Sequence, residues 1–198
     1  MARQENKKNN MAKSIGILGG TFNPPHIGHL VIAQDILEAL ELDRVFFIPT
    51  NISPHKETGN AGAAQRLEMT RLTIAENENF KVLDLEIKRG GTSYTVDTVR
   101  KLKDNYPNDE LYLIVGSDLA NTFSSWKDIQ ELKKLAKIVA AQRKNYPLKE
   151  KDSFLIVNIR QVDISSSRIR DLVKKGKSIR GFVKQGVVEY INQHRLYV

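Results

Sequence analysis

The fold is decided by residues 14–40, which read SIGILGGTFNPPHIGHLVIAQDILEAL. The apolar run Ser14–Leu18 is typical of a buried strand, and it ends at two glycines. Two prolines and two histidines follow, and apolar residues then recur at mostly helical spacing, which predicts a helix from Ile27 to Leu40. A strand that passes through a glycine-rich turn into a helix begins an α/β pattern.

The rest of the chain continues this alternation. Residues Asn51–Ala63 are rich in Gly, Pro, Asn and His and are predicted to form an exposed loop. Apolar strands that alternate with helices predict an α/β fold, a doubly wound parallel sheet with helices on both faces and a C-terminal helical segment. The further strands are expected at Arg44–Pro49, Phe80–Ile87, Leu111–Val115, Lys137–Ala141 and Phe154–Val157, and the further helices at Ala64–Glu76, Val96–Asn105, Ser166–Lys175 and Val183–Gln193.

The composition is that of a folded globular protein. The 198 residues include 40% hydrophobic and 27% charged residues, enough for one domain with a substantial core. The absence of cysteine excludes disulfides, thiolate catalysis and cysteine-based zinc sites, and it fits a reducing compartment. Residues 1–12 are polar and lack the apolar core of a signal peptide. We therefore expect a disordered extension at 1–12, a single domain at 13–198, a cytoplasmic location and no membrane partner.

The positive charge is unevenly distributed. The formal net charge is +8; residues 143–198 contain 13 Lys and Arg against 5 Asp and Glu, whereas residues 1–142 contain 18 of each kind and cancel. A basic C-terminal quarter suits nucleic acid, but it equally suits a pocket for small polyphosphates. A solvated lysine-rich helix face accounts for part of it.

Three distinctive segments follow predicted strands: GGTFNPPHIGH at residues 19–29, IPTNISPHK at 48–56 and IVGSD at 114–118. Ligands of open α/β sheets bind beyond the carboxyl ends of the strands, so these segments are expected to meet at one site.

The first segment has the features of a phosphate site. Gly19 and Gly20 let an anion approach the backbone closely, and the first helical turn after Pro25 offers unpaired N–H groups. His26 and His29 are three residues apart and share one face of that turn, where two imidazoles can donate hydrogen bonds to phosphate oxygens. The alternatives are a capping histidine, a simple tight turn, or a metal-binding pair, for which neither a cysteine nor a nearby carboxylate completes a tetrahedral set.

A second phosphate-ready helix start lies near the C-terminus. Ser165 and Ser166 are good N-cap residues, and Gly176 ends the helix. Arg170 can contact a phosphate through two hydrogen bonds, whereas the serines alone would be explained by capping.

The motifs point to a known family. Neither GxxxxGK[ST] nor GxGxxG follows the first strand, which argues against a Walker kinase and an ordinary dehydrogenase. With His26-Ile27-Gly28-His29, the chain resembles the HxGH nucleotidyltransferase superfamily, and GGTFNPPHIGH is similar to the version in bacterial nicotinate-nucleotide adenylyltransferases. Residues 164–170, ISSSRIR, resemble that family's ISSTxIR, with Ser167 in place of the usual threonine.

The resemblance implies a Rossmann-like fold and adenylyl transfer from ATP to nicotinate mononucleotide, giving deamido-NAD and pyrophosphate. The mononucleotide phosphate would attack the α-phosphorus of ATP in line, with His26 and His29 as catalytic residues at the phosphates. Mg²⁺ would be held mainly by the ATP phosphates rather than by a protein metal site. The ATP-binding residues implied are Gly19, Gly20, Thr21, Phe22, His26, His29, Ser166 and Arg170.

The resemblance also assigns residues to the mononucleotide. The turn around Ser93 would offer N–H groups to the nicotinate carboxylate, and Trp126 would stack on the pyridine ring, although a Trp is also common as a half-buried anchor. The full set implied is His55, Lys56, Thr92, Ser93, Tyr94, Asp118, Trp126 and Arg143.

Other functions remain open at this point. The same chemistry could use nicotinamide mononucleotide or phosphopantetheine as the acceptor, or a cytidylyl donor. A basic nucleic-acid-binding module would leave the histidine motif unexplained, and we expect no nucleic-acid partner. A catalytically silent nucleotide sensor is disfavoured because both histidines and Arg170 are present. The sequence does not decide between a monomer and a homo-oligomer.

Overall fold

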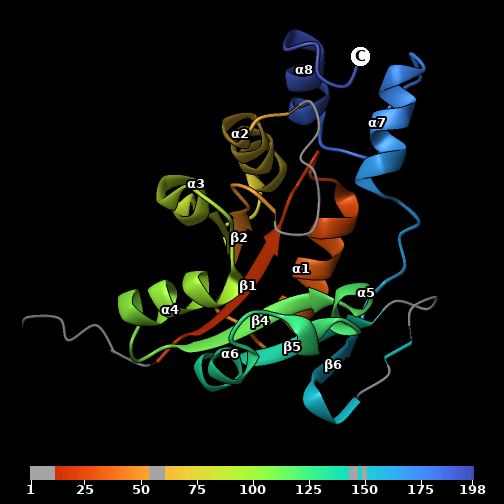
Figure 1. Cartoon of the computed structure of the whole chain (residues 1–198). Coiled ribbons are helices and arrows are strands. Elements are labelled where there is room, and N and C mark those ends of the chain that lie inside the picture. Colours follow the sequence, from red (N-terminus) through yellow and green to blue (C-terminus); the bar gives the residue numbers. More distant parts are fainter. Residues whose placement is uncertain (1–11, 54–60, 143–146, 149–150) are drawn as a thin grey trace, which may run out of the picture.

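The computed structural model describes residues 12–53, 61–142, 147–148 and 151–198, and its centre is a six-stranded parallel sheet (Figure 1). The strand order is β3-β2-β1-β4-β5-β6. This is the order of the dinucleotide-binding Rossmann folds, so the predicted α/β architecture is confirmed. The strands are β1 (Ser14–Gly20), β2 (Arg44–Pro49), β3 (Phe80–Val82), β4 (Glu110–Gly116), β5 (Lys137–Gln142) and β6 (Leu155–Asn158).

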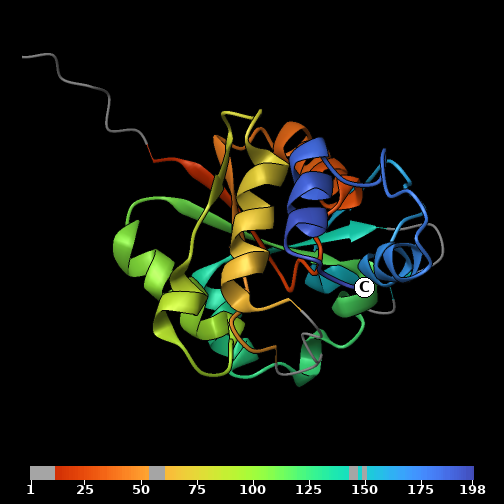
Figure 2. The same cartoon turned by 90° about the horizontal axis from the view of Figure 1, so that it is seen from above.

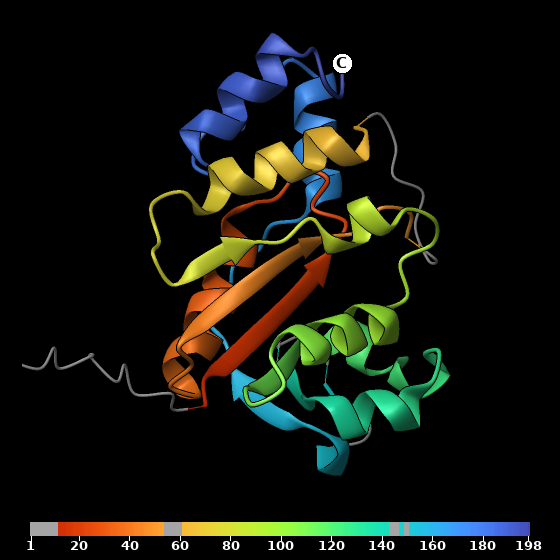
Figure 3. The same ribbon diagram turned by 90° about the vertical axis from the view of Figure 1, so that its left-hand side faces the viewer.

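Helices cover both faces of the sheet, as Figure 3 shows with α2 above the strands and α4 and α6 below them. On one face, Ile32 and Ile36 of α1 (Ile27–Ala39) pack on β2 together with Ile74 of α2 (Ala63–Ile74). On the other face, α4 (Thr95–Asn105) and α6 (Ile129–Leu135) bury apolar side chains against β1 and β4. Each fully buried aliphatic side chain contributes about 2 kcal/mol, so these two cores hold the layers together.

A third core joins the C-terminal segment to the sheet domain. It contains Met69 of α2, Ile169 of α7 (Ser166–Lys174) and Val187 of α8 (Gln185–Gln193). Figure 2 shows α2 and α8 side by side, and they contact each other. The helices after β6 are therefore part of the fold, as the predicted C-terminal helical segment requires.

The sheet opens at the carboxyl end of β1. This strand pairs with β2 as far as Gly20, but its register with β4 extends only to Leu18. The predicted strand stopped at Leu18, so β1 is two residues longer than expected. Because β1 and β4 are the neighbours at which the strand order reverses, the opening lies where doubly wound folds bind ligands.

Two parts of the sequence-based prediction are wrong. Residues 80–87 form not one strand but β3 followed by a short helix, α3 (Leu85–Arg89). The alternation of apolar and polar residues is real, but Glu86 turns inward and is buried. Ala61, in the predicted exposed loop, is also buried and packs in the third core. The loop residues 54–60 lie outside the described residues.

Several elements were not predicted. These are α5 (Ser117–Ala120), α6, and the 3₁₀ turns at Phe123–Ser125 and Lys151–Ser153. They are short, and their sequences carry no clear helical period. Residues 1–11 lie outside the described part of the chain, so a disordered extension and the domain boundary stay predictions.

A buried arginine ties the ends of β1 and β2 together. Arg66 of α2 is fully buried and donates from Nη1 to the carbonyl of Thr21 (2.8 Å) and from Nη2 to the carbonyl of Asn51 (2.8 Å). Its burial lowers the pKa of the guanidinium, and the nearby Tyr197 and Glu86 oppose that shift. Removing one partner from such an arrangement leaves carbonyl oxygens without a donor.

Arg66→Met should lower the free energy of unfolding by about 3 kcal/mol, because two carbonyl groups lose charged donors. Urea denaturation of the purified protein measures it. The matched control is Arg71→Met on the same helix, because Arg71 forms an exposed ion pair with Glu68. That change should stay within about 0.5 kcal/mol. Equal stability of the two variants would contradict the anchoring role.

Candidate active site

A cavity of about 720 Å³ lies beyond the carboxyl ends of β1 and β4. Its volume is within the range of small-molecule sites. It is lined by the loop between β1 and α1, by the starts of α4, α5 and α7, and by the segment before α6. The predicted site residues that line it are Gly19, Gly20, Thr21, Phe22, His26, His29, Ser93, Tyr94, Asp118, Trp126, Ser166 and Arg170.

The remaining predicted residues are not among the lining residues. Thr92 forms a β-bridge with Ile52, and its side chain is exposed. His55, Lys56 and Arg143 lie outside the described residues. Their roles stay predictions.

The two histidines lie next to each other at the start of α1. His26 is buried at the N-cap, and its backbone N–H donates to Nδ1 of His29 (3.0 Å). The centroids of the two imidazole rings are 3.8 Å apart. The rings of Phe22 and His29 form an edge-to-face pair with centroids 5.0 Å apart. Because Nδ1 of His29 accepts a hydrogen bond, a neutral His29 carries its proton on Nε2. The ring is therefore a donor suited to an anion in the cavity.

The histidine loop is fixed by residues from the other end of the chain. Arg170 Nη1 donates to the carbonyl of Asn23 (2.7 Å), and Ser166 Oγ donates to the carbonyl of Pro24 (2.8 Å). The buried Tyr197 donates its hydroxyl to Oδ1 of Asn23 (2.6 Å). Burial raises the pKa of the Tyr197 phenol, so this donor keeps its proton. Arg170 is thus both a lining cation and a support of the loop.

The start of α7 is capped as predicted. Ser165 Oγ accepts from the backbone N–H of Arg168 (3.2 Å), which leaves Ser166 and Ser167 at the cavity wall. Gly28 is also required locally, because a Cβ there would lie 3.0 Å from the His26 ring and 3.1 Å from Ile164. The close packing of the α1 and α7 starts therefore depends on a glycine between the histidines.

The opposite side of the cavity is aromatic. Trp126 is half-buried and packs against Phe123 with ring centroids 5.1 Å apart, while another part of it lines the cavity. Trp126 is therefore a half-buried anchor, which was the alternative to a stacking role, and it also forms part of the cavity wall. Tyr94 is 37% exposed, and Lys127 Nζ lies 4.5 Å from its ring centroid.

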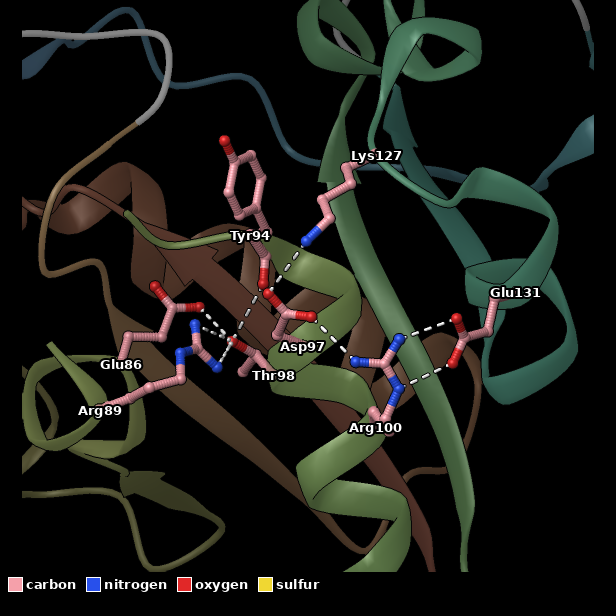
Figure 4. A network of polar contacts seen from close by, with 8 residues as sticks. All are labelled: Glu86, Arg89, Tyr94, Asp97, Thr98, Arg100, Lys127 and Glu131. Atoms are coloured by element: carbon pink, nitrogen blue, oxygen red, sulfur yellow. Dashed lines mark hydrogen bonds and ion pairs between the residues drawn. The ribbon is translucent and has the colours of Figure 1, made fainter. Parts of the chain in front are cut away.

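Sequence reasoning missed Glu86, a buried carboxyl group of the cavity wall. Its Oε1 accepts from Thr98 Oγ1 (2.7 Å), and the guanidinium of Arg89 donates to the same hydroxyl oxygen (Figure 4). Burial raises the pKa of Glu86, against the opposing effects of Thr98, Ser93 and Arg89. In the sequence, Glu86 is one of several charged residues in the alternating run before the paired glycines, and nothing there marks it as buried.

Comparison with known proteins agrees with this geometry. The family model described as cytidylyltransferase-like matches residues 17–172. A protein of Shouchella clausii named "Probable nicotinate-nucleotide adenylyltransferase" is 44% identical over 93% of this chain and 97% of its own length. A protein of the same name from Geobacter sp. is 41% identical over 93% and 98%.

Solved structures show the same fold. The nicotinic acid mononucleotide adenylyltransferase of Plasmodium falciparum, complexed with NaAD, superposes with a TM-score of 0.80 at 22% identity, covering 93% of this chain and 97% of that one. A Vibrio parahaemolyticus structure titled a putative nicotinate-nucleotide adenylyltransferase gives a TM-score of 0.68 at 22% identity, covering 93% and 95%.

Fold, cavity and motifs together define a nucleotidyltransferase of the cytidylyltransferase-like class. Within that class, the chain belongs to the nicotinate-nucleotide adenylyltransferase family, because relatives of that name are 37–44% identical over nearly its whole length. No helix in the described part of the chain is long and apolar enough to cross a membrane.

The pH dependence of stability should report the burial of Glu86. Because its pKa is raised from 4.5, the folded state keeps this proton to a higher pH than the unfolded state. Stability should therefore fall as the pH rises from the ordinary glutamate range through the raised pKa. Glu86→Gln cannot titrate, so its melting temperature should rise relative to the wild type over that range. Calorimetry from about pH 4 to about pH 8 measures the difference; parallel curves would contradict it.

Proposed function

We propose that the chain transfers the adenylyl group of ATP to nicotinate mononucleotide, giving deamido-NAD and pyrophosphate, a step of NAD biosynthesis. The observation that carries this proposal is the pairing of His26 and His29 at a helix start on one side of a cavity whose other side is formed by Tyr94 and Trp126. The names of the relatives support the choice of acceptor.

The reaction needs no covalent intermediate. A phosphate oxygen of the mononucleotide forms a bond to the α-phosphorus of ATP while the bond from that phosphorus to the oxygen bridging to the β-phosphorus breaks, and its electron pair leaves with pyrophosphate. Charge on the phosphoryl oxygens is stabilised by hydrogen-bond donors held in place before the reaction. We assign that role to His26, His29 and Arg170, with Ser166 at the start of α7.

Positioning supplies the rest of the acceleration. Gly19, Gly20, Thr21 and Phe22 lie on the histidine side and would receive ATP. On the acceptor side, Trp126 would stack on the pyridine ring, the turn at Thr92, Ser93 and Tyr94 would bind the nicotinate carboxylate, and Asp118 would accept from a ribose hydroxyl. His55, Lys56 and Arg143 are proposed to bind the mononucleotide as well. Holding two reactants in line converts a bimolecular reaction into an effectively unimolecular one.

We propose that Mg²⁺ enters with ATP and is held mainly by its phosphate oxygens, where it would neutralise part of their charge. Among residues 12–53, 61–142, 147–148 and 151–198, no three His, Asp or Glu side chains gather into a metal-binding group. A cytoplasmic location and the oligomeric state stay predictions.

The contacts made by the basic C-terminal quarter favour the small-molecule site over nucleic-acid binding. Within it, Arg160 pairs with Asp35 and Lys184 with Glu76, and Arg170 lies at the cavity. These cations serve the fold and the site. Nicotinamide mononucleotide and phosphopantetheine remain the alternative acceptors.

Pyrophosphate release from ATP and Mg²⁺ tests the proposed function. We expect rapid release with nicotinate mononucleotide and much slower release with nicotinamide mononucleotide or phosphopantetheine. Release only with another acceptor would retain the ATP site and overturn the acceptor assignment. A lack of release with all three would contradict adenylyl transfer.

His29→Ala should lower kcat at least about a hundredfold, because the reaction loses a positioned donor at the phosphates. The matched control is His194→Ala, an exposed histidine after α8 that does not line the cavity and should leave kcat near the wild-type value. Circular dichroism establishes that both variants are folded. Near-normal turnover of folded His29→Ala would rule out the assigned role.

A further inference from the structure

The permanent cations of the cavity come from two different elements. Among the described residues, the lysines and arginines that line it are Arg170 and Lys127. Arg170 belongs to α7 and is tied to the histidine loop. Lys127 follows Trp126 and reaches the start of α4. Figures 1 and 3 show α7 and α4 on different sides of the edge where the strands end. The proposed acceptor carries two anionic groups, a phosphate and a ring carboxylate.

Lys127 is held loosely. Its Nζ lies over the Tyr94 ring at 4.5 Å and 3.6 Å from Oδ2 of Asp97, longer than a close charge-assisted hydrogen bond. Asp97 has a nearer partner, because Arg100 Nη1 lies 2.9 Å from its Oδ1 (Figure 4). Arg100 in turn binds both carboxylate oxygens of Glu131, each at 2.8 Å. The ammonium of Lys127 therefore lies beside the Tyr94 ring, with its carboxylate partner Asp97 beyond close hydrogen-bond distance.

Among the cations of the network in Figure 4, Lys127 is the one that lines the cavity. The network of Figure 4 contains the cations Arg89, Arg100 and Lys127 and the carboxyl groups Glu86, Asp97 and Glu131. Arg89 donates to Thr98, and Arg100 binds Asp97 and Glu131, whereas Lys127 lines the cavity. A carboxylate bound beside Lys127 would be attracted by the ammonium group, whereas a neutral carboxamide would not.

We propose that the ammonium group of Lys127 recognises the ring carboxylate of the acceptor and so sets the preference for nicotinate over nicotinamide mononucleotide. This inference rests on the proposed adenylyl transfer to nicotinate mononucleotide. Lys127 acts here as a specificity-determining residue. The turn at residues 92–94 would recognise the carboxylate by hydrogen bonds and Trp126 the ring by its shape, and Lys127 adds a charge.

The test is kcat/KM for both acceptors, at saturating ATP and Mg²⁺, in the wild type and in Lys127→Met. Methionine keeps most of the length of the side chain and removes its charge. We expect kcat/KM for nicotinate mononucleotide to fall about five- to tenfold, since the partly exposed lysine is screened by water. The value for nicotinamide mononucleotide should stay unchanged, as should the KM for ATP.

Two further variants complete the experiment. Lys127→Arg keeps the charge and should keep the preference, and Lys133→Met removes an exposed lysine of α6 that does not line the cavity and should change neither acceptor. An equal loss with both acceptors, or no change in their ratio in Lys127→Met, would overturn the inference. Failure of the proposed function would be seen separately, in a wild type that does not use nicotinate mononucleotide.

Discussion

The site depends on a buried guanidinium. Arg66 bonds the carbonyl of Thr21, just after β1, and the carbonyl of Asn51, just after β2. The first loop leads to the histidines and the second contacts the turn before α4, so one cation holds the two loops together. Burial lowers the pKa of this guanidinium, and the nearby Tyr197 and Glu86 oppose the shift.

Asn51 links the end of β2 to the turn before α4. Its backbone N–H donates to Ser93 Oγ (2.9 Å), and its Nδ2 donates to the carbonyl of Gly91 (2.9 Å). Gly90 and Gly91 have positive φ values, a conformation that glycine adopts without strain. The turn before α4 is therefore hydrogen-bonded to the end of β2. Arg66 links the end of β2 to the end of β1 in turn. Such a linked arrangement suits a reaction that relies on positioning rather than on a covalent nucleophile.

The sequence predicts the long, periodic elements and the motifs well, because these depend on local pattern. The β1–α1 segment, β2 and α4 are within two residues of expectation, and most of the motif residues meet at one cavity. It does not predict Glu86, Arg66 or Lys127, since their importance comes from burial or tertiary contacts that no local spacing encodes. An alternating run such as residues 80–87 suits both a strand and a short helix, and the burial of Glu86 beside Thr98 goes with the helix.

The histidine loop shows why local pattern alone is insufficient. Its supports are Arg170, Ser166 and Tyr197, which lie 142 to 174 residues away from their partners in the chain. The GGTFNPPHIGH motif provides the turn itself, and hydrogen bonds from α7 and from Tyr197 hold it in place. The third core, which buries Ile169 and Tyr197 with Met69 of α2, therefore supports the histidine loop as well as the fold. Because Arg66 extends from the same α2, the two halves of the site share one structural support.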